Sequence, residues 1–211
     1  MAQRLSKKPL SEGFELWDKG YFLGAMRLFI FKAETSPPFQ LGACLDAMGH
    51  LLARLEEGPD AKENFGFAAE KYNMIQQPLL AKVMLVKGVD AEDGPEAALP
   101  QIEALLKEND PERKAHENSD AKVKAALARA YHLRGELLSQ IEGNVEKALA
   151  DAEYAAQIGW DRDHAAYYLA ANMRHQLGDI VGATGNLEKC LARNANYIPA
   201  YEMLAAMLLT P

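Results

Sequence analysis

The sequence predicts an all-helical protein built from repeated helix pairs, and two observations carry this prediction. Ala, Leu, Glu and Lys dominate the 211 residues, whereas Val, Ile and Thr, which favour strands or restrict helices, are sparse. Small and apolar residues also recur at a fixed spacing in the C-terminal half. A chain of this length could form one or two compact domains, or a stack of repeats that bury their apolar faces against their neighbours. The fixed spacing favours the stack.

The spacing is 35 residues, and it holds through three successive units between residues 121 and 211. The three columns are Tyr131, Ala166 and Tyr201; Gly135, Ala170 and Ala205; and Leu138, Met173 and Leu208. The second column keeps small residues and the third keeps large apolar ones, which is the mark of an internal repeat. A turn follows the helix in each complete unit, opened by a glycine and followed by alanine, as at Gly143 with Ala148 and Gly178 with Ala183.

This pattern resembles the tetratricopeptide repeat. That family places a bulky, a small and a large apolar residue on the first helix of a pair, and Ala, a large residue and a small one on the second. The second-helix matches are Ala25-Phe29, Ala61-Phe65-Ala68, Ala148-Ala152-Ala155 and Ala183-Leu187-Cys190. The terminal proline of the family is present only as Pro37. The resemblance implies a right-handed superhelix of about five helix pairs plus a terminal helix, as a single domain over residues 1–211.

In order along the chain, we expect repeat one over residues 6–37 and repeat two over residues 42–73. Gly58-Pro59-Asp60 should form the turn inside repeat two, with proline in the first helical turn. Repeat three, residues 78–109, matches most weakly. Val83–Val86 there would suit a strand, but a lone strand has no partner, so a helix is expected. Its second helix should begin near Pro100, because proline disrupts a helix interior.

A longer loop is predicted over residues 107–121, where Ser119 and Asp120 can cap the helix that follows. The segment reads as a surface loop or as a functional insertion. The last helix, residues 199–209, is apolar through Leu204, Met207, Leu208 and Leu209. It either closes the stack or precedes further chain in the natural protein.

Composition bears on which partners the protein could have. The formal net charge of −7 opposes nucleic-acid binding, which needs clustered Lys and Arg. No apolar run approaches the length of a membrane span or of a signal peptide. Cys44 and Cys190 are far apart, in apolar surroundings, and we expect buried reduced thiols rather than a disulfide. A cytoplasmic protein is predicted.

Enzyme motifs are missing from the sequence, so we expect neither catalysis nor a cofactor. The glycines Gly178, Gly182 and Gly185 follow no predicted strand and are better explained by close helix packing. The acidic segment 90–94 departs from a calcium loop in the place of its glycine and lacks the closing Glu. Residues 161–164, Asp-Arg-Asp-His, could supply metal ligands but are more simply a polar link that caps the next helix, and no metal site is predicted.

In the tetratricopeptide family the first helix of each pair lines a concave groove, and the resemblance therefore implies a set of partner-contacting residues. These are Arg129, His132, Glu136, His164, Tyr167, Tyr168, Arg174 and His175, with Leu133 and Gln140 beside them and with His50 and Asp46 on the same face in repeat two. Arg grips carboxylates and Tyr offers rigid contact area, so a partner peptide with acidic or polar side chains is expected. The alternative is a solvated face on which these residues gather by chance. If the histidines bind as cations, affinity should fall between pH 6 and 8.

A heat-shock chaperone tail is not the expected ligand. The two-carboxylate clamp of the family needs Lys and Asn on the first groove helix, Asn on the second, and Lys and Arg on the third. The aligned residues here are Leu10, Phe14, Ala47, Leu79 and Val83. Phe14 and Trp17 either pack in the core or form an apolar groove for a helical partner.

The predicted function is thus a scaffold or adaptor that holds a peptide or helix of another protein within a multiprotein assembly. The alternative is a structural module that associates with itself through the apolar last helix, and an unrecognised enzyme is a third possibility.

Overall fold

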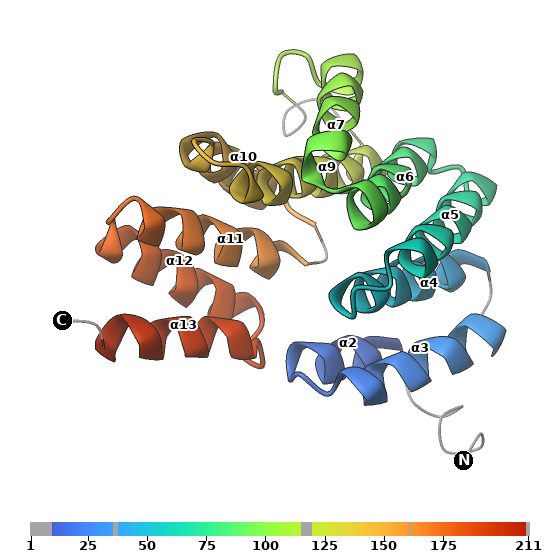
Figure 1. The fold of residues 1–211 in the computed structure, drawn as a ribbon, viewed down its shortest axis with the longest axis horizontal. Helices are drawn as coiled ribbons and strands as arrows, with labels where there is room; N and C mark the ends of the chain where they lie inside the picture. Colours follow the sequence, from blue (N-terminus) through green and yellow to red (C-terminus); the bar gives the residue numbers. More distant parts are fainter. Residues whose placement is uncertain (1–9, 36–37, 115–119, 161, 210–211) are drawn as a thin grey trace. The chain divides into compact units, whose positions relative to one another are not determined.

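The computed structural model describes residues 10–35, 38–114, 120–160 and 162–209, and in these ranges it contains only helices and the turns between them (Figure 1). Contacts divide the chain into two compact units, residues 1–94 and 95–211. The described helices of unit 1 are α2 (Leu10–Asp18), α3 (Phe22–Thr35), α4 (Pro38–Arg54), α5 (Gly58–Met74) and α6 (Pro78–Asp93). Those of unit 2 are α7 (Pro95–Asn109), α9 (Ala121–Gln140), α10 (Val145–Ile158), α11 (Asp163–Gln176), α12 (Ile180–Arg193) and α13 (Ile198–Leu209).

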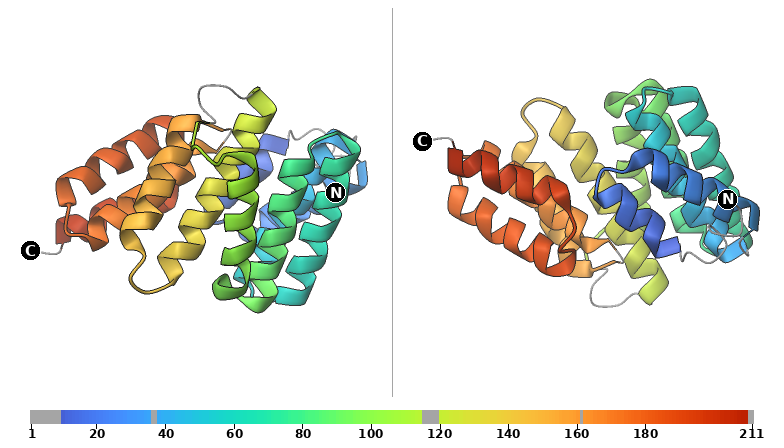
Figure 2. Two further views of the ribbon diagram at one scale, coloured as in Figure 1. Left: turned by 90° about the horizontal axis from the view of Figure 1, so that it is seen from above. Right: turned by 90° about the horizontal axis from the view of Figure 1, so that it is seen from below.

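The all-helical fold class is confirmed, as are the helix pairs that precede a terminal helix. Within unit 1 each helix packs on the next, from α2 through α6. Within unit 2, α7 packs on α9, and α9 to α13 then pack each on the next (Figure 2). The predicted third pair is α6 with α7, and the division between the units falls between these two helices.

Small residues on the first helix of a pair make room for large ones on the second. A Cβ added at Gly13 would lie 2.6 Å from the Phe29 ring, and one added at Gly49 would lie 2.8 Å from the Phe65 ring. In unit 2 a Cβ at Gly135 would lie 3.2 Å from the carbonyl oxygen of Ala148 on α10. The small-residue column therefore exists because backbones and rings approach closely at these positions.

The turn glycines of the repeat adopt a backbone conformation that other residues avoid. Gly20, Gly143 and Gly178 have φ between 76° and 79°, in the left-handed region. Each ends the first helix of a pair and lets the chain reverse into the second, as the sequence pattern predicts.

Two predicted boundaries were wrong. The second helix of repeat three begins at Pro95, not near Pro100, and Pro100 lies inside it. Pro95 suits the first turn of a helix. Pro100 has no N–H to bond the Glu96 carbonyl, but both residues lie on the exposed side of α7, where water can bond that carbonyl instead. Repeat two also begins earlier than residue 42, because α4 starts at Pro38.

The predicted loop 107–121 is shorter than expected, since α7 continues to Asn109. Asp120 caps α9, accepting hydrogen bonds from the backbone N–H groups of Lys122 (2.8 Å) and Val123 (3.0 Å), as predicted. Ser119 and Asp161 lie outside the described residues. The α4–α5 turn also agrees with the sequence, because proline occupies the first turn of α5.

Both cysteines are buried free thiols, as predicted. Burial raises the pKa of Cys44 to about 11, so that its thiol stays protonated and unreactive near neutral pH. No described helix is both long and apolar enough to cross a bilayer.

Candidate functional site

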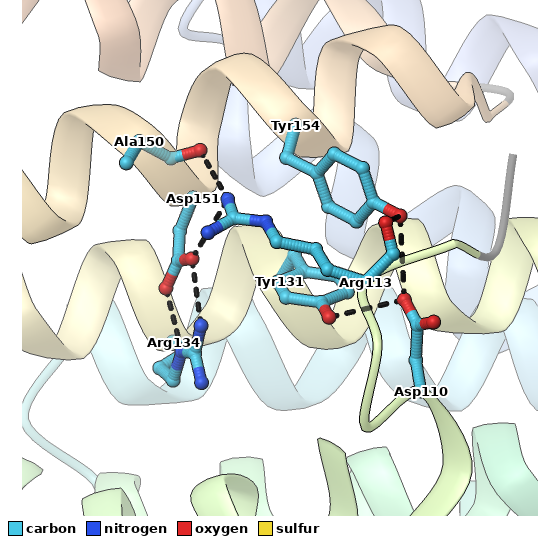
Figure 3. Close-up of polar contacts among 7 residues, drawn as sticks. All are labelled: Asp110, Arg113, Tyr131, Arg134, Ala150, Asp151 and Tyr154. Carbon is cyan, nitrogen blue, oxygen red and sulfur yellow. Dashed lines mark hydrogen bonds and ion pairs between the residues drawn. The ribbon is translucent and has the colours of Figure 1, made fainter. Parts of the chain in front are cut away.

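A buried ion network fixes the position of α9, the helix that carries three of the predicted groove residues (Figure 3). Asp151 on α10 accepts two hydrogen bonds from Arg134 of α9, from Nε at 2.6 Å and from Nη2 at 2.7 Å. Arg113, in the segment after α7, lies 3.2 Å from the same carboxylate. Burial opposes the charge on Arg134, but its hydrogen bonds to Asp151 raise its pKa. The carboxylate thereby joins α9, α10 and the segment after α7.

Asp110 forms a second anchor in the same network. Its carboxylate accepts from the Tyr131 hydroxyl of α9 at 3.0 Å. The Tyr154 hydroxyl of α10 shares its single hydrogen between this carboxylate, at 3.4 Å, and the Arg113 carbonyl. Burial, together with the nearby Asp110 charge, raises the pKa of Tyr131 well above its usual range. The segment after α7 is therefore pinned to both following helices, which makes α9 a rigid support.

Two predicted residues of α9, Arg129 and His132, lie against one indole ring, and a third, Glu136, lies against His132; we call these residues and Trp160 the Trp160 cluster. The Arg129 guanidinium lies 5.5 Å from the centre of the Trp160 ring, and the His132 ring lies 5.2 Å from it. Glu136 is one turn further along α9, with its Oε2 3.4 Å from His132 Nδ1. His132 is buried, whereas Glu136 is half-exposed. Trp160 reaches this helix from the loop between α10 and α11.

A second group, the Tyr197 cluster, is built in a similar way one repeat later. Tyr197, in the loop between α12 and α13, packs its ring 5.1 Å from His164 and 5.3 Å from Tyr168, both on α11. His164 is buried and Tyr168 is half-buried, and burial raises the pKa of Tyr168. Tyr167 is also half-buried and lies under the ammonium group of Lys189, which is 5.9 Å from its ring centre.

Arg174 is held by its own chain rather than presented to a partner. Its guanidinium pairs with Glu153 of α10 and with Asp179, each at 2.5 Å. Asp179 in turn accepts from the backbone N–H of Gly182 at 2.9 Å, which caps α12 and, with Arg174, lowers the pKa of Asp179. Arg174, which the sequence analysis placed among the partner-contacting residues, thus stabilises the turn between α11 and α12. His175, its neighbour, is exposed at the end of α11.

In unit 1, the two predicted aromatic residues of α2 pack into the core. Phe14 and Trp17 lie 5.1 Å and 6.4 Å from the Phe29 ring of α3, within an apolar core cluster of the unit. Trp17 also meets His50 of α4 at 5.7 Å. Both side chains are only partly exposed.

His50 and Asp46 of α4 are joined by a lysine that the sequence reading did not single out. Lys87 of α6 is buried and donates to Asp46 Oδ1 at 2.9 Å, and its Nζ lies 2.8 Å from His50 Nε2. The three side chains bridge α4 and α6 across the first helices of two successive pairs.

Sequence reading missed Trp160 and Tyr197, because both lie outside the helices whose register defined the groove. The only available signal was an aromatic residue a few positions before each first helix. Among the described residues, no group of three potential metal ligands is present.

No family model and no curated protein sequence matches the chain. Among solved structures, a thermophilic TPR protein of Thermus thermophilus is similar over 99% of this chain and 100% of its own, with 19% identity and a TM-score of 0.61. A Rap protein in complex with Competence and Sporulation Factor is similar over 88% of this chain, with 13% identity and a TM-score of 0.58, and the match covers 53% of that protein. The fold of this chain is therefore that of the tetratricopeptide-repeat proteins.

Proposed function

We propose that the protein is an interaction scaffold, rather than an enzyme, which holds a peptide or helical segment of another protein against α9 and α11 of unit 2. The observation that carries this proposal is the pair of aromatic clusters around Trp160 and Tyr197. Together they bring arginine, histidine, tyrosine and tryptophan side chains to the first helices of two successive pairs. Of these, arginine, tyrosine and tryptophan dominate the energetics of protein interfaces.

The charge of the clusters favours an acidic or polar partner segment. Arg129 and His132 supply positive charge or hydrogen-bond donors in a chain whose net charge is −7. Comparison with the Rap protein supports the proposal in general terms, since a chain of this fold is there in complex with a factor.

A chaperone tail remains outside this proposal. Of the five residues aligned with the two-carboxylate clamp, Ala47 and Val83 are buried in unit 1 and cannot contact a ligand. Leu10 and Phe14 belong to the apolar cluster around Phe29. None of the five carries a donor for a carboxylate, so a clamped tail would leave its charge unpaired at a cost of several kcal/mol.

The proposal predicts a preference for acidic peptides that depends on Arg129. Short fluorescein-labelled peptides of equal length, with acidic, neutral or basic side chains, are titrated with the protein and followed by fluorescence anisotropy. We expect the acidic set to bind best, and Arg129→Glu to weaken that binding at least about tenfold, or ~1.4 kcal/mol. Lys107→Glu makes the same charge change at an exposed position of α7 and should leave affinity within about twofold.

Circular dichroism confirms that each variant keeps the helical content of the parent. Binding that ignores peptide charge, or that falls equally in both variants, would contradict recognition at the Trp160 cluster.

A second prediction concerns pH. If His132 binds the partner as a cation beside Glu136, affinity for an acidic partner should fall as the pH rises from 6 to 8. The same anisotropy titration between pH 6 and 8 measures this slope, and His132→Gln should flatten it. A slope that is already flat in the parent protein would eliminate a role for the histidine charge.

A further inference from the structure

Lys87 carries a buried charge in unit 1, and its position dictates the charge of a neighbouring histidine. The Lys87 side chain on α6 is only 10% exposed, and its Nζ lies 2.9 Å from Asp46 Oδ1 and 2.8 Å from His50 Nε2 on α4. A lysine ammonium donates hydrogen bonds but cannot accept one. Nε2 must therefore accept from Lys87, which requires a neutral His50 ring with its hydrogen on Nδ1.

Rings from two further helices lie against His50 and leave it partly open to solvent. The Trp17 ring of α2 lies 5.7 Å from the His50 ring, and the Phe65 ring of α5 lies 5.3 Å from it, edge to face. The remaining neighbour, α3, meets α4 through the apolar cluster that contains Phe29. The His50 side chain is 34% exposed, so a proton can reach the ring from water, while the surrounding rings limit its hydration.

Three charged side chains decide whether the ring accepts that proton. Asp46, one turn before His50 on α4, has its Oδ1 3.5 Å from Nε2, and Asp18, which follows Trp17 on α2, is buried. Carboxylates favour a charged ring, whereas the Lys87 ammonium opposes it from 2.8 Å. A protonated His50 would therefore place two cations side by side and leave them to share the Asp46 carboxylate, which is costly for buried charges.

We propose that His50 makes unit 1 sensitive to acid: protonation of its ring breaks the contact with Lys87 and loosens α6 from α4. Lys87 bridges these two helices, whereas the main packing of α6 within the unit is on α5. Protonation thus weakens the contact between α4 and α6 and leaves the packing of α5 on α6 in place. His50 is the only histidine among residues 1–94, so unit 1 has one side chain that ordinarily changes its charge between pH 5 and 8.

The direction of the effect follows from proton binding. A free histidine has a pKa of about 6.5, so in the unfolded chain it is about nine-tenths protonated at pH 5.5 and about one-tenth protonated at pH 7.5. The folded unit, with the Lys87 contact intact, binds fewer protons than the unfolded chain. Its stability is therefore present at pH 7.5 and falls as the pH falls towards 5.5, by up to about tenfold in the equilibrium constant for unfolding.

The two tryptophans of the chain allow unit 1 to be followed by itself. Trp17 lies in unit 1 and Trp160 in unit 2, so in a Trp160→Phe background the fluorescence of Trp17 reports the urea denaturation of unit 1. We expect the unfolding equilibrium constant to rise roughly three- to tenfold from pH 7.5 to 5.5. His50→Gln, whose amide oxygen still accepts from Lys87, should abolish this rise, whereas His175→Gln, at an exposed position of α11, should keep it.

Lys87→Met distinguishes the proposed cause from a purely structural role of the histidine. Without the ammonium, Asp46 and His50 remain as a pair at positions i and i+4, which is stabilised when the ring is protonated. The pH dependence should then reverse, so that this variant unfolds less readily at pH 5.5 than at pH 7.5. A Trp17 signal that is insensitive to pH in the parent, or a Lys87→Met variant that is as sensitive to acid as the parent, would overturn the proposal.

This inference concerns unit 1 and does not rely on peptide binding by unit 2. Peptide binding can therefore fail while acid sensitivity is observed, and the reverse, so the two proposals are tested separately.

Discussion

Replacing Asp151 by alanine is expected to lower the free energy of unfolding by about 3 kcal/mol, the largest electrostatic effect in the described part of the chain. The Asp151 side chain is only 2% exposed, and it accepts both hydrogen bonds of the Arg134 fork as well as the charge of Arg113. Removing it leaves two arginines facing an apolar surrounding. Both are partly exposed, so water reaches them, and the loss should lie at the lower end of the range for a broken buried pair.

Urea denaturation followed by circular dichroism measures this change, and Glu153→Ala is its control. Glu153 lies two residues further along α10 and also pairs with an arginine, Arg174, but its side chain is 43% exposed. Pairs of that kind contribute about 0–1 kcal/mol. A double variant, Asp151→Leu with Arg134→Met, should recover part of the loss, because it removes both buried charges. Equal effects of Asp151→Ala and Glu153→Ala would show that burial of the network does not matter.

The repeat made most of the fold predictable from the sequence. The 35-residue columns through Gly135 and Leu138 report contacts between helices that are close in the chain, and such contacts leave a regular pattern. Pro100 was misread because proline is disfavoured inside a helix and was therefore taken to mark a helix start, whereas α7 begins five residues earlier at Pro95. The exposed position of Pro100 near the start of α7 could not be recognised before the helix face was known.

The candidate site was less predictable than the fold. Helical register placed Arg129, His132 and Glu136 together on α9, and the structure brings the first two to the Trp160 ring and Glu136 to His132. Helical register could not show that Trp160 and Tyr197 fold back over His132 and His164, because the path of a connecting loop depends on tertiary packing. Nor could it show that Arg174 is held by Glu153, since that pair joins two helices and its members are 21 residues apart in the chain.

The Asp151 network was missed for the same reason. Asp151 is 17 residues from Arg134 in the chain and further from Arg113, and the three residues come from three different segments. An acidic residue on the second helix of a pair is ordinarily a surface residue, so nothing in the local pattern marked Asp151 as buried.

Replacing Gly135 by leucine is expected to destabilise unit 2 by about 3 kcal/mol, at the upper end of the usual range for overpacking. A Cβ added at Gly135 would lie 3.1 Å from Leu169 and 3.2 Å from the Ala148 carbonyl, so a larger side chain must push α10 away from α9. The backbone of α10 cannot yield as a flexible side chain would, because it is fixed by Asp151 and Tyr154.

Gly185→Leu is the matched control for this prediction. Gly185 lies within α12 in the same unit, and a Cβ there meets nothing within 4 Å. Leucine at that position should raise stability by roughly 0.5–1 kcal/mol through helix propensity alone. If urea denaturation shows that Gly135→Leu lowers the free energy of unfolding and Gly185→Leu raises it, close contact between helices explains the small-residue column. Stabilisation by both would mean that the small-residue column reflects no packing constraint between the helices.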